Sequence, residues 1–264
     1  MRDLNDLMMD LDRIADIAYE LSQHFGGVET SCRKKKTSTY YLAKIVPECL
    51  SLLRILPGSR FTDPGDLFDF PSFCSISRNL IEAANLHWYY CVDQTDSDLS
   101  EFRFHLYDFH DYRARIRIGR FLGAAEEELD SLSQEADQIK AIIKDSAFFT
   151  QLLPEVQRQI LKGRRCAEFN QSEMVEKREI DVEFFNGIHK LLSTNTHSTP
   201  SAISAVVHSQ LKGTGLQNAF SCLVLSYVTS FVAELVRSTG SMWKMQFDNI
   251  ESKKLVYSYA GALK

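Results

Sequence analysis

Apolar residues recur at helical spacing along almost the whole chain. Near the N-terminus this spacing predicts a helix over residues 3–25, closed by Gly26 and Gly27. Two more helices are expected over residues 39–56, with a kink or break at Pro47, and over residues 71–91. No segment alternates between apolar and polar residues over several strands, as a sheet requires. The pattern therefore predicts an all-α protein.

The second half of the chain continues this pattern. Helices are expected over residues 98–121, 124–149 and 176–192, from Pro200 onward and over 215–237, before an amphipathic segment at 241–264. The interpretation is one domain spanning residues 1–264, a helical bundle with its core at 39–237. A strongly charged helical insertion is expected at 124–171.

The most apolar run lies at residues 219–236. It contains Ser221, Ser226 and Glu234, and no other segment resembles it. It is therefore interpreted as the central buried helix of the bundle, with a lone membrane anchor as the alternative. The N-terminal segment lacks the layout of a signal peptide, and the six cysteines form no C-x-x-C pair. A cytoplasmic protein with reduced thiols and no membrane partner is expected.

Composition narrows the function classes. A formal charge of −5 disfavours a dedicated non-specific nucleic-acid binder, although local basic patches such as residues 33–36, expected in a polar loop, stay open. No phosphate-binding loop, dinucleotide fingerprint or metalloprotease motif is present. His105 and His110 lie five residues apart, which is not the spacing of a metal-binding pair on a helix. No cofactor and no metal are expected.

The helix over residues 71–91 carries the first candidate chemistry. With Arg78 as the zero of a helical wheel, Glu82 falls at about 40°, Asn85 at about −20° and Tyr89 at about 20°. Most of the remaining circumference is apolar, so a narrow polar stripe lies in an apolar jacket. It could be a surface face with an ordinary ion pair, a buried structural network or a functional polar pocket. If the stripe is buried, the pocket is the better interpretation, because a buried ion pair is weak evidence of stability.

A second candidate is the segment "LLSTNTHSTPSAI", residues 191–203. It places His197 and Ser193 among several hydroxyl side chains just before a predicted helix N-terminus at Thr199 and Pro200. A helix start favours an anion, and a histidine can act as acid, base or phosphate donor near neutral pH. A capping loop with a solvated histidine is the alternative.

These two segments together resemble a family of mostly bacterial helical proteins known only as a domain of unknown function. Members pair an R-x-x-x-E helix with a downstream Y-x-x-L-S-x-x-x-H segment. Arg78 and Glu82 match the first motif, and Leu192, Ser193 and His197 match the second, while Phe185 or Ile188 stands in place of the tyrosine. The resemblance, over residues 39–237, implies an all-α fold and a shared Arg–Glu–His site, and no established reaction.

A looser similarity is to the HEPN superfamily of helical ribonucleases and nucleotide-binding proteins. The hallmark of that superfamily is an arginine followed, after four to six residues, by a histidine. The four-residue form is absent here, and the six-residue form occurs once, as Arg103 and His110.

The helix over residues 98–121 is rich in arginine. Arg113, Arg117 and Arg120 fall on one face of it. They could contact the phosphates of a nucleotide or an RNA, or they could form a solvated face paired with the acidic run at residues 126–128.

Two hypotheses for function follow. In the first, the protein is a metal-independent enzyme acting on a phosphodiester or nucleotide, a ribonuclease-like effector of the defence or toxin type. Arg78 would hold the phosphate, His197 would be the acid or base and Glu82 would orient one of them, with Asn85, Tyr89, Ser193 and the three arginines as binding residues. In the second, the protein is a non-catalytic interaction module or oligomeric scaffold that binds a partner or a second copy through its amphipathic terminal helices.

Overall fold

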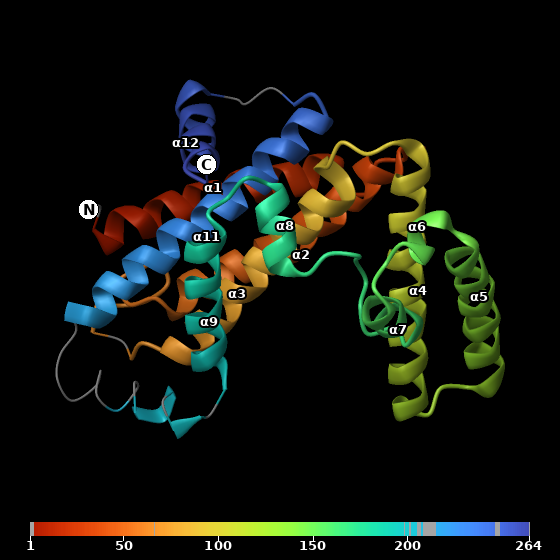
Figure 1. Cartoon of the computed structure of the whole chain (residues 1–264). Coiled ribbons are helices and arrows are strands. Elements are labelled where there is room, and N and C mark those ends of the chain that lie inside the picture. The colour runs from red at the N-terminus through yellow and green to blue at the C-terminus, as the bar shows by residue number, and fades with distance from the viewer. Residues whose placement is uncertain are drawn as a thin grey trace. The chain divides into compact units, whose positions relative to one another are not determined.

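The protein is all-α, as predicted. The computed structural model describes residues 3–65, 67–197, 199–200, 202–204, 207, 215–245 and 249–263, and none of these is in a β-strand (Figure 1). Two compact units divide the chain: unit 1 comprises Met1–Val92 with Gln171–Lys264, and unit 2 comprises Asp93–Asn170. We expected one domain with an insertion at residues 124–171, and the segment that forms its own unit begins earlier, before the arginine-rich helix.

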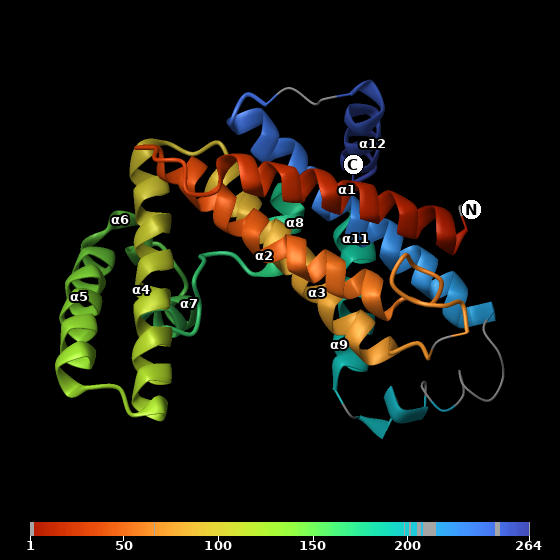
Figure 2. The same cartoon turned by 180° about the vertical axis from the view of Figure 1, so that it is seen from behind.

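Unit 1 is a bundle of long helices from both ends of the chain. It contains α1 (Leu4–Phe25), α2 (Arg33–Ile55), α3 (Phe70–His87), the π-helical turn η1 (Trp88–Val92), α8 (Gln171–Lys177), α9 (Val182–Thr196), α11 (Gly215–Met242) and α12 (Ile250–Gly261). Both views show α11 running alongside α1, with α12 near the C-terminus packed over them (Figures 1 and 2).

Helix α11 is the core of unit 1. It packs against α1, α2, α3 and α12, and its side chains are buried on nearly every side; Leu225, Val228 and Phe231 are fully enclosed. Its Ala219–Met242 segment is also the one stretch among the described residues that is long and apolar enough to cross a membrane. Because 67% of its most apolar window is buried by the other helices, the expected role as central helix accounts for its composition.

The apolar stripe of α1 is buried within the same unit. Leu11, Ile14 and Leu21 are inaccessible to solvent, because α1 packs against α2, α11 and α12. The side chain of Asp3 caps the helix by accepting a hydrogen bond from the backbone N–H of Asp6 (2.8 Å). The stripe proposed as a docking face for a partner is therefore covered by the protein's own helices.

Two boundaries differ from the sequence prediction. Helix α2 starts at Arg33, so the basic run at residues 33–36 forms its first turn rather than a loop, and the helix continues through Pro47 without a break. The helix predicted over residues 176–192 is divided, because the backbone of Glu179 adopts a positive φ of 59° between α8 and α9. The helix predicted from Pro200 lies mostly outside the described residues; within them, Thr199 Oγ1 accepts from the N–H of Ala202 (3.3 Å).

Unit 2 is a helical hairpin with two short helices. It contains α4 (Ser97–Leu122), α5 (Glu126–Asp145), α6 (Ala147–Thr150) and α7 (Pro154–Leu161). Asp96 caps the start of α4, and Gly123 ends it with a left-handed φ of 74°. Helices α4 and α5 lie side by side in both views (Figures 1 and 2). Their core consists of Phe102, Leu106, Phe109, Ile116, Ala136, Ile143, Phe149 and Ile160.

Candidate functional site: the polar stripe of α3

The polar stripe predicted on α3 contains the ion pair that its spacing indicates. Arg78 Nε lies 2.7 Å from Glu82 Oε1, and the two side chains are 31% and 30% exposed. They are neither fully solvated nor enclosed, so solvent-borne molecules can reach this end of the stripe. An arginine preceding a glutamate by four residues is the less favourable order for an isolated helix pair, and here a third group shares the carboxylate.

That third group is His189 of α9. Its Nε2 lies 3.3 Å from the same Glu82 Oε1, and its ring stacks on the buried Phe185 at 5.5 Å between centroids. Partial burial acts against ionisation of Glu82, but the hydrogen bonds from His189 and Arg78 outweigh it and lower the pKa of this carboxyl. Glu82 therefore stays ionised and holds a guanidinium and an imidazole at one point on the surface of unit 1.

The inner end of the stripe is a buried hydrogen-bond network. Asn85 is fully buried; its Nδ2 donates to Gln171 Oε1 (2.8 Å), and its Oδ1 accepts from Arg178 Nη1. The Arg178 guanidinium is stacked on Phe231, 5.0 Å from the ring centroid. Burial lowers its pKa to about 10, although Glu234 and Tyr227 act in the opposite direction. Asn85 thus joins α3 to α8.

Tyr89 continues the stripe into the π-helical turn η1. It is 1% exposed and packs edge-to-face on Tyr90. Next to it, His87 is buried and its Nε2 lies 3.0 Å from Thr239 Oγ1 of α11. These two side chains belong to the packed interior, so a ligand bound at Arg78 would not reach them.

No hydrogen bond or ion pair joins His197 or Ser193 to Arg78 or Glu82 in the described part of the chain. His197 is exposed at the C-terminal end of α9, and Ser193 is half-buried one turn before it. His197 lies eight residues beyond His189, about 12 Å along the helix axis. Among the described residues, the histidine that contacts Glu82 is His189.

His189, Gln171 and Arg178 were missed by sequence reasoning. His189 shares the apolar face of α9 with Phe185 and Leu192, which lie within about 60° of it on a helical wheel, and a histidine on a buried face was the signal that could have identified it. Arg178 lies within the charged segment "SEMVEKRE", which is typical of a solvated surface, so nothing local indicated its burial.

The arginines of α4 belong to unit 2. Arg117 is exposed and its Nη1 donates to the carbonyl of Gly163 (3.1 Å), just beyond α7. Arg113 is half-buried against the same glycine, where a Cβ would lie 2.5 Å from the Cβ of Arg113. Arg120 is exposed. None of the three forms an ion pair with residues 126–128 in the described part of the chain, and Arg117 instead hydrogen-bonds to a carbonyl beyond the C-terminal end of α7.

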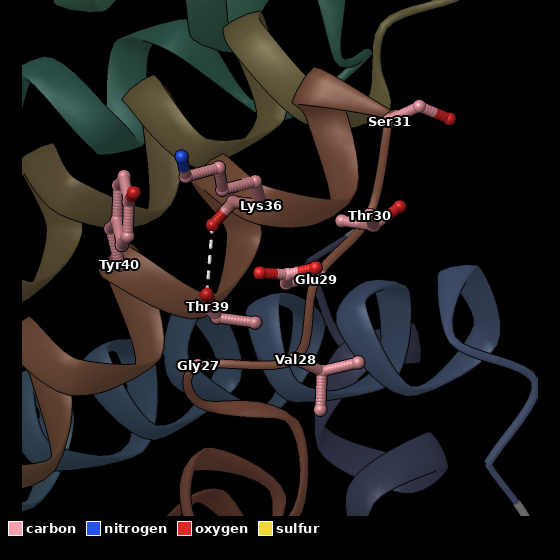
Figure 3. Close-up of a pocket in the computed structure, with 8 residues that line it drawn as sticks. All are labelled: Gly27, Val28, Glu29, Thr30, Ser31, Lys36, Thr39 and Tyr40. Carbon is pink, nitrogen blue, oxygen red and sulfur yellow. Dashed lines mark hydrogen bonds between the residues drawn. The ribbon is translucent and has the colours of Figure 1, made fainter.

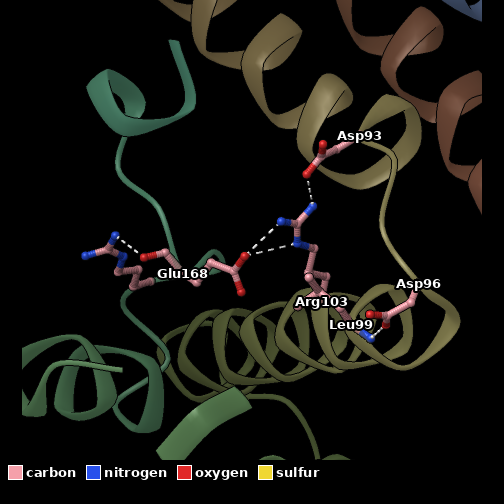
Figure 4. Close-up of polar contacts among 6 residues, drawn as sticks. Asp93, Asp96, Leu99, Arg103 and Glu168 are labelled. Atoms are coloured by element: carbon pink, nitrogen blue, oxygen red, sulfur yellow. Dashed lines mark hydrogen bonds and ion pairs between the residues drawn. The ribbon is translucent and has the colours of Figure 1, made fainter. Parts of the chain in front are cut away.

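Arg103, the arginine of the HEPN-like spacing, is engaged elsewhere. It is 4% exposed; its Nη1 lies 2.7 Å from Asp93 Oδ2, and its Nη2 lies 2.8 Å from the buried Glu168 Oε1. Figure 4 shows the two carboxylates approaching the guanidinium from different sides. These residues tie the first and last segments of unit 2 together. His110 lies seven residues further along α4, and half-burial lowers its pKa, with Arg117 adding to the shift.

A separate hollow of about 570 Å³ lies between residues 27–31 and the first turns of α2. Figure 3 shows Glu29 and Lys36 on its rim, and the hydroxyl of Thr39 donating to the carbonyl of Lys36 (2.8 Å). Four basic residues fill the first turn of α2, which itself contains no acidic residue, and the helix dipole disfavours them there. None of the stripe residues lines this hollow.

The described residues contain no group of three or more His, Cys, Asp or Glu side chains arranged to hold a metal ion. The six cysteines are unbonded, with Cys49, Cys74, Cys91 and Cys222 buried. Burial raises the pKa of the Cys74 thiol to about 12, which makes it a poor nucleophile. The stripe's chemistry is therefore that of Arg78, Glu82 and His189.

Fold and site together define an all-α protein with a buried apolar helix near its C-terminus and a half-exposed Arg–Glu–His cluster on α3 and α9. Comparisons with protein-family models, with curated proteins and with solved structures give no match.

Proposed function

We propose that unit 1 binds the phosphate of RNA or of a nucleotide at Arg78, Glu82 and His189, and that His189 acts on an RNA phosphodiester there as acid and base without a metal. The observation that supports this is the single oxygen Glu82 Oε1 shared by a guanidinium and an imidazole in a half-exposed position. A carboxylate that orients an imidazole is the arrangement that general acid–base catalysis uses.

Each group has a separate role in this proposal. Arg78 uses Nε for Glu82, which leaves its Nη groups to donate to a phosphate. With Nε2–H donated to Glu82, Nδ1 of His189 is the basic nitrogen. It takes the proton from a ribose 2′-hydroxyl as that oxygen attacks the adjacent phosphorus. The P–O5′ bond breaks, Nδ1 of His189 gives the proton it has taken to the departing 5′-oxygen, and a 2′,3′-cyclic phosphate forms.

The test is incubation of the purified full chain with RNA and with nucleotides. We expect cleavage that persists in chelator, and a loss of roughly 100-fold or more in Glu82→Gln and His189→Asn. Arg78→Lys keeps the charge but loses the fork of donors, so it should weaken binding more than it slows the step.

The Lys44–Glu48 pair of α2 supplies a matched control, because it has the same i,i+4 spacing on an exposed surface. Lys44→Ala should leave activity unchanged. Tryptophan fluorescence from Trp88 and Trp243 verifies that each variant keeps unit 1 folded. Activity that survives in a folded His189→Asn protein would overturn the assignment of the base, and a chain that neither binds nor cleaves any of these substrates would overturn the proposal.

A further inference from the structure

An exposed apolar surface lies at the end of the α4–α5 hairpin. Ile118, Phe121 and Leu122 of α4 are 58%, 88% and 72% exposed. A groove of about 360 Å³ opens beside them and is lined by Leu129 and Leu132 of α5. These five residues are here called the tip. Large apolar side chains gathered in this way on a protein surface mark an interaction site.

Charges of both signs lie beside the tip, with basic residues on α4 and acidic residues on α5. Arg115 of α4 and Glu128 of α5 line the groove together. Arg115 lies 3.9 Å from its ion-pair partner Asp111 and 5.8 Å from the centroid of the Tyr112 ring, and Glu128 forms no ion pair with any described residue. Glu126 and Glu127 precede Glu128 on the exposed first turn of α5.

This distribution selects the kind of partner. A polyanion or an acidic peptide would be attracted by Arg115 and Arg120 but repelled by the glutamates of α5. A basic partner would be attracted by the glutamates but repelled by the arginines. A two-fold axis over the groove would lay α4 of one copy across α5 of the other, so that each Arg115 would meet a Glu128 and the apolar side chains would cover one another. A self-complementary patch is what a two-fold dimer requires.

We propose that the tip is the interface of a homodimer. The partner is a second copy of this chain, bound through Phe121 and Leu122 at the centre and through Arg115–Glu128 pairs at the rim. Aromatic and aliphatic side chains at the centre with charges around them are the usual anatomy of such interfaces. This inference involves unit 2 alone and does not rest on the proposed function.

Sedimentation equilibrium of the full chain over a range of concentrations tests it. We expect the mass to rise from one to two chains with concentration, and Phe121→Glu to hold it at one chain throughout. Leu153→Glu is the matched control, because Leu153 is another leucine of unit 2 with the same 72% exposure as Leu122 but lies outside the tip. It should dimerise like the unaltered chain.

A charge exchange tests the arrangement of the two copies. Arg115→Glu and Glu128→Arg should each weaken dimerisation by about tenfold or more, and the chain carrying both changes should regain it. Circular dichroism verifies that α4 and α5 remain helical in each variant. A chain that stays monomeric at every concentration, a dimer that persists in Phe121→Glu, or a double variant as weak as the single ones would each overturn the proposal.

Discussion

The Arg103 cluster offers the sharpest test of what holds unit 2 together. Hydrogen bonds join its guanidinium to Asp93 and Glu168, and Arg103 and Glu168 are both nearly inaccessible to solvent. Arg103→Met keeps much of the side chain's apolar volume but removes the positive charge, leaving the Glu168 carboxylate buried without it. The cost of burying that carboxylate without the arginine should then determine how far the free energy of unfolding falls.

The expected loss follows from burial. Removing one partner of a buried ion pair costs about 3–5 kcal/mol. Asp93 is 23% exposed, so water replaces part of its interaction and we expect the lower half of that range. A domain is stable by roughly 5–15 kcal/mol, so Arg103→Met should remove a large share of the stability of unit 2.

The assay can separate the two units. Both tryptophans, Trp88 and Trp243, lie in unit 1, so their fluorescence follows that unit, whereas circular dichroism follows the helices of both. In a urea titration, Arg103→Met should produce an early loss of helix signal while the tryptophan transition changes much less.

Two variants control the interpretation. Arg115→Met changes an exposed arginine on the same helix and should cost less than about 1 kcal/mol. Arg103→Met combined with Glu168→Leu removes both charges of the buried pair, and it should recover most of the loss because neither charge is then left buried without the other. An Arg103→Met variant no less stable than Arg115→Met would refute the reasoning.

Three further outcomes are expected in unit 1. Burial, with a smaller contribution from Arg178, lowers the pKa of His87 to about 3. Below the ordinary pKa of 6.5, His87 of the unfolded chain therefore binds a proton that the folded chain does not. The contribution of His87 to stability is complete above that pH and is lost as the pH drops toward 3. Urea midpoints followed by fluorescence should show this, and His87→Gln should reduce the dependence of the midpoint on pH. The pKa of Glu82 is lowered, so the contribution of Glu82 to stability is complete above the ordinary pKa of 4.5 and is lost as the pH falls through the lowered pKa. Glu82→Gln should abolish that part of the dependence of stability on acid pH. Leu225→Ala in α11 should cost about 2–5 kcal/mol in thermal or urea unfolding because the site is fully buried, whereas Leu223→Ala, at a position 45% exposed, should cost less than about 1 kcal/mol.

The helical content could be predicted from local patterns, and so could the central position of α11. Each depends on periodicity and on the absence of charges, which act within a few turns of the chain. The continuation of α2 through Pro47 could not be predicted, because the packing of α2 against α1 and α3 overrides the local preference for a break. The start at Arg33 was missed for a related reason: four basic residues are unfavourable in a first helical turn.

The candidate site shows the same division. Arg78 and Glu82 could be paired from the sequence because they lie one turn apart on a single helix. The histidine that joins them comes from a helix more than a hundred residues away, and two histidines of that segment, His189 and His197, were available. A loop rich in hydroxyl groups favoured His197 as a ligand site, whereas the packing of α9 on α3 brings His189 to Glu82.

The buried end of the stripe explains why α3 carries polar residues along one line. Asn85 holds Gln171 and Arg178 at the two ends of α8, and the positive φ at Glu179 turns the chain directly into α9. The position of α8 against α3 therefore fixes where α9 begins and which of its faces meets α3. His189 lies two turns into α9, so the buried Asn85 network positions the imidazole beside Glu82. Asn85→Leu should thus disturb the Glu82–His189 contact although neither residue is altered, and the chemical shift of the His189 ring would report it.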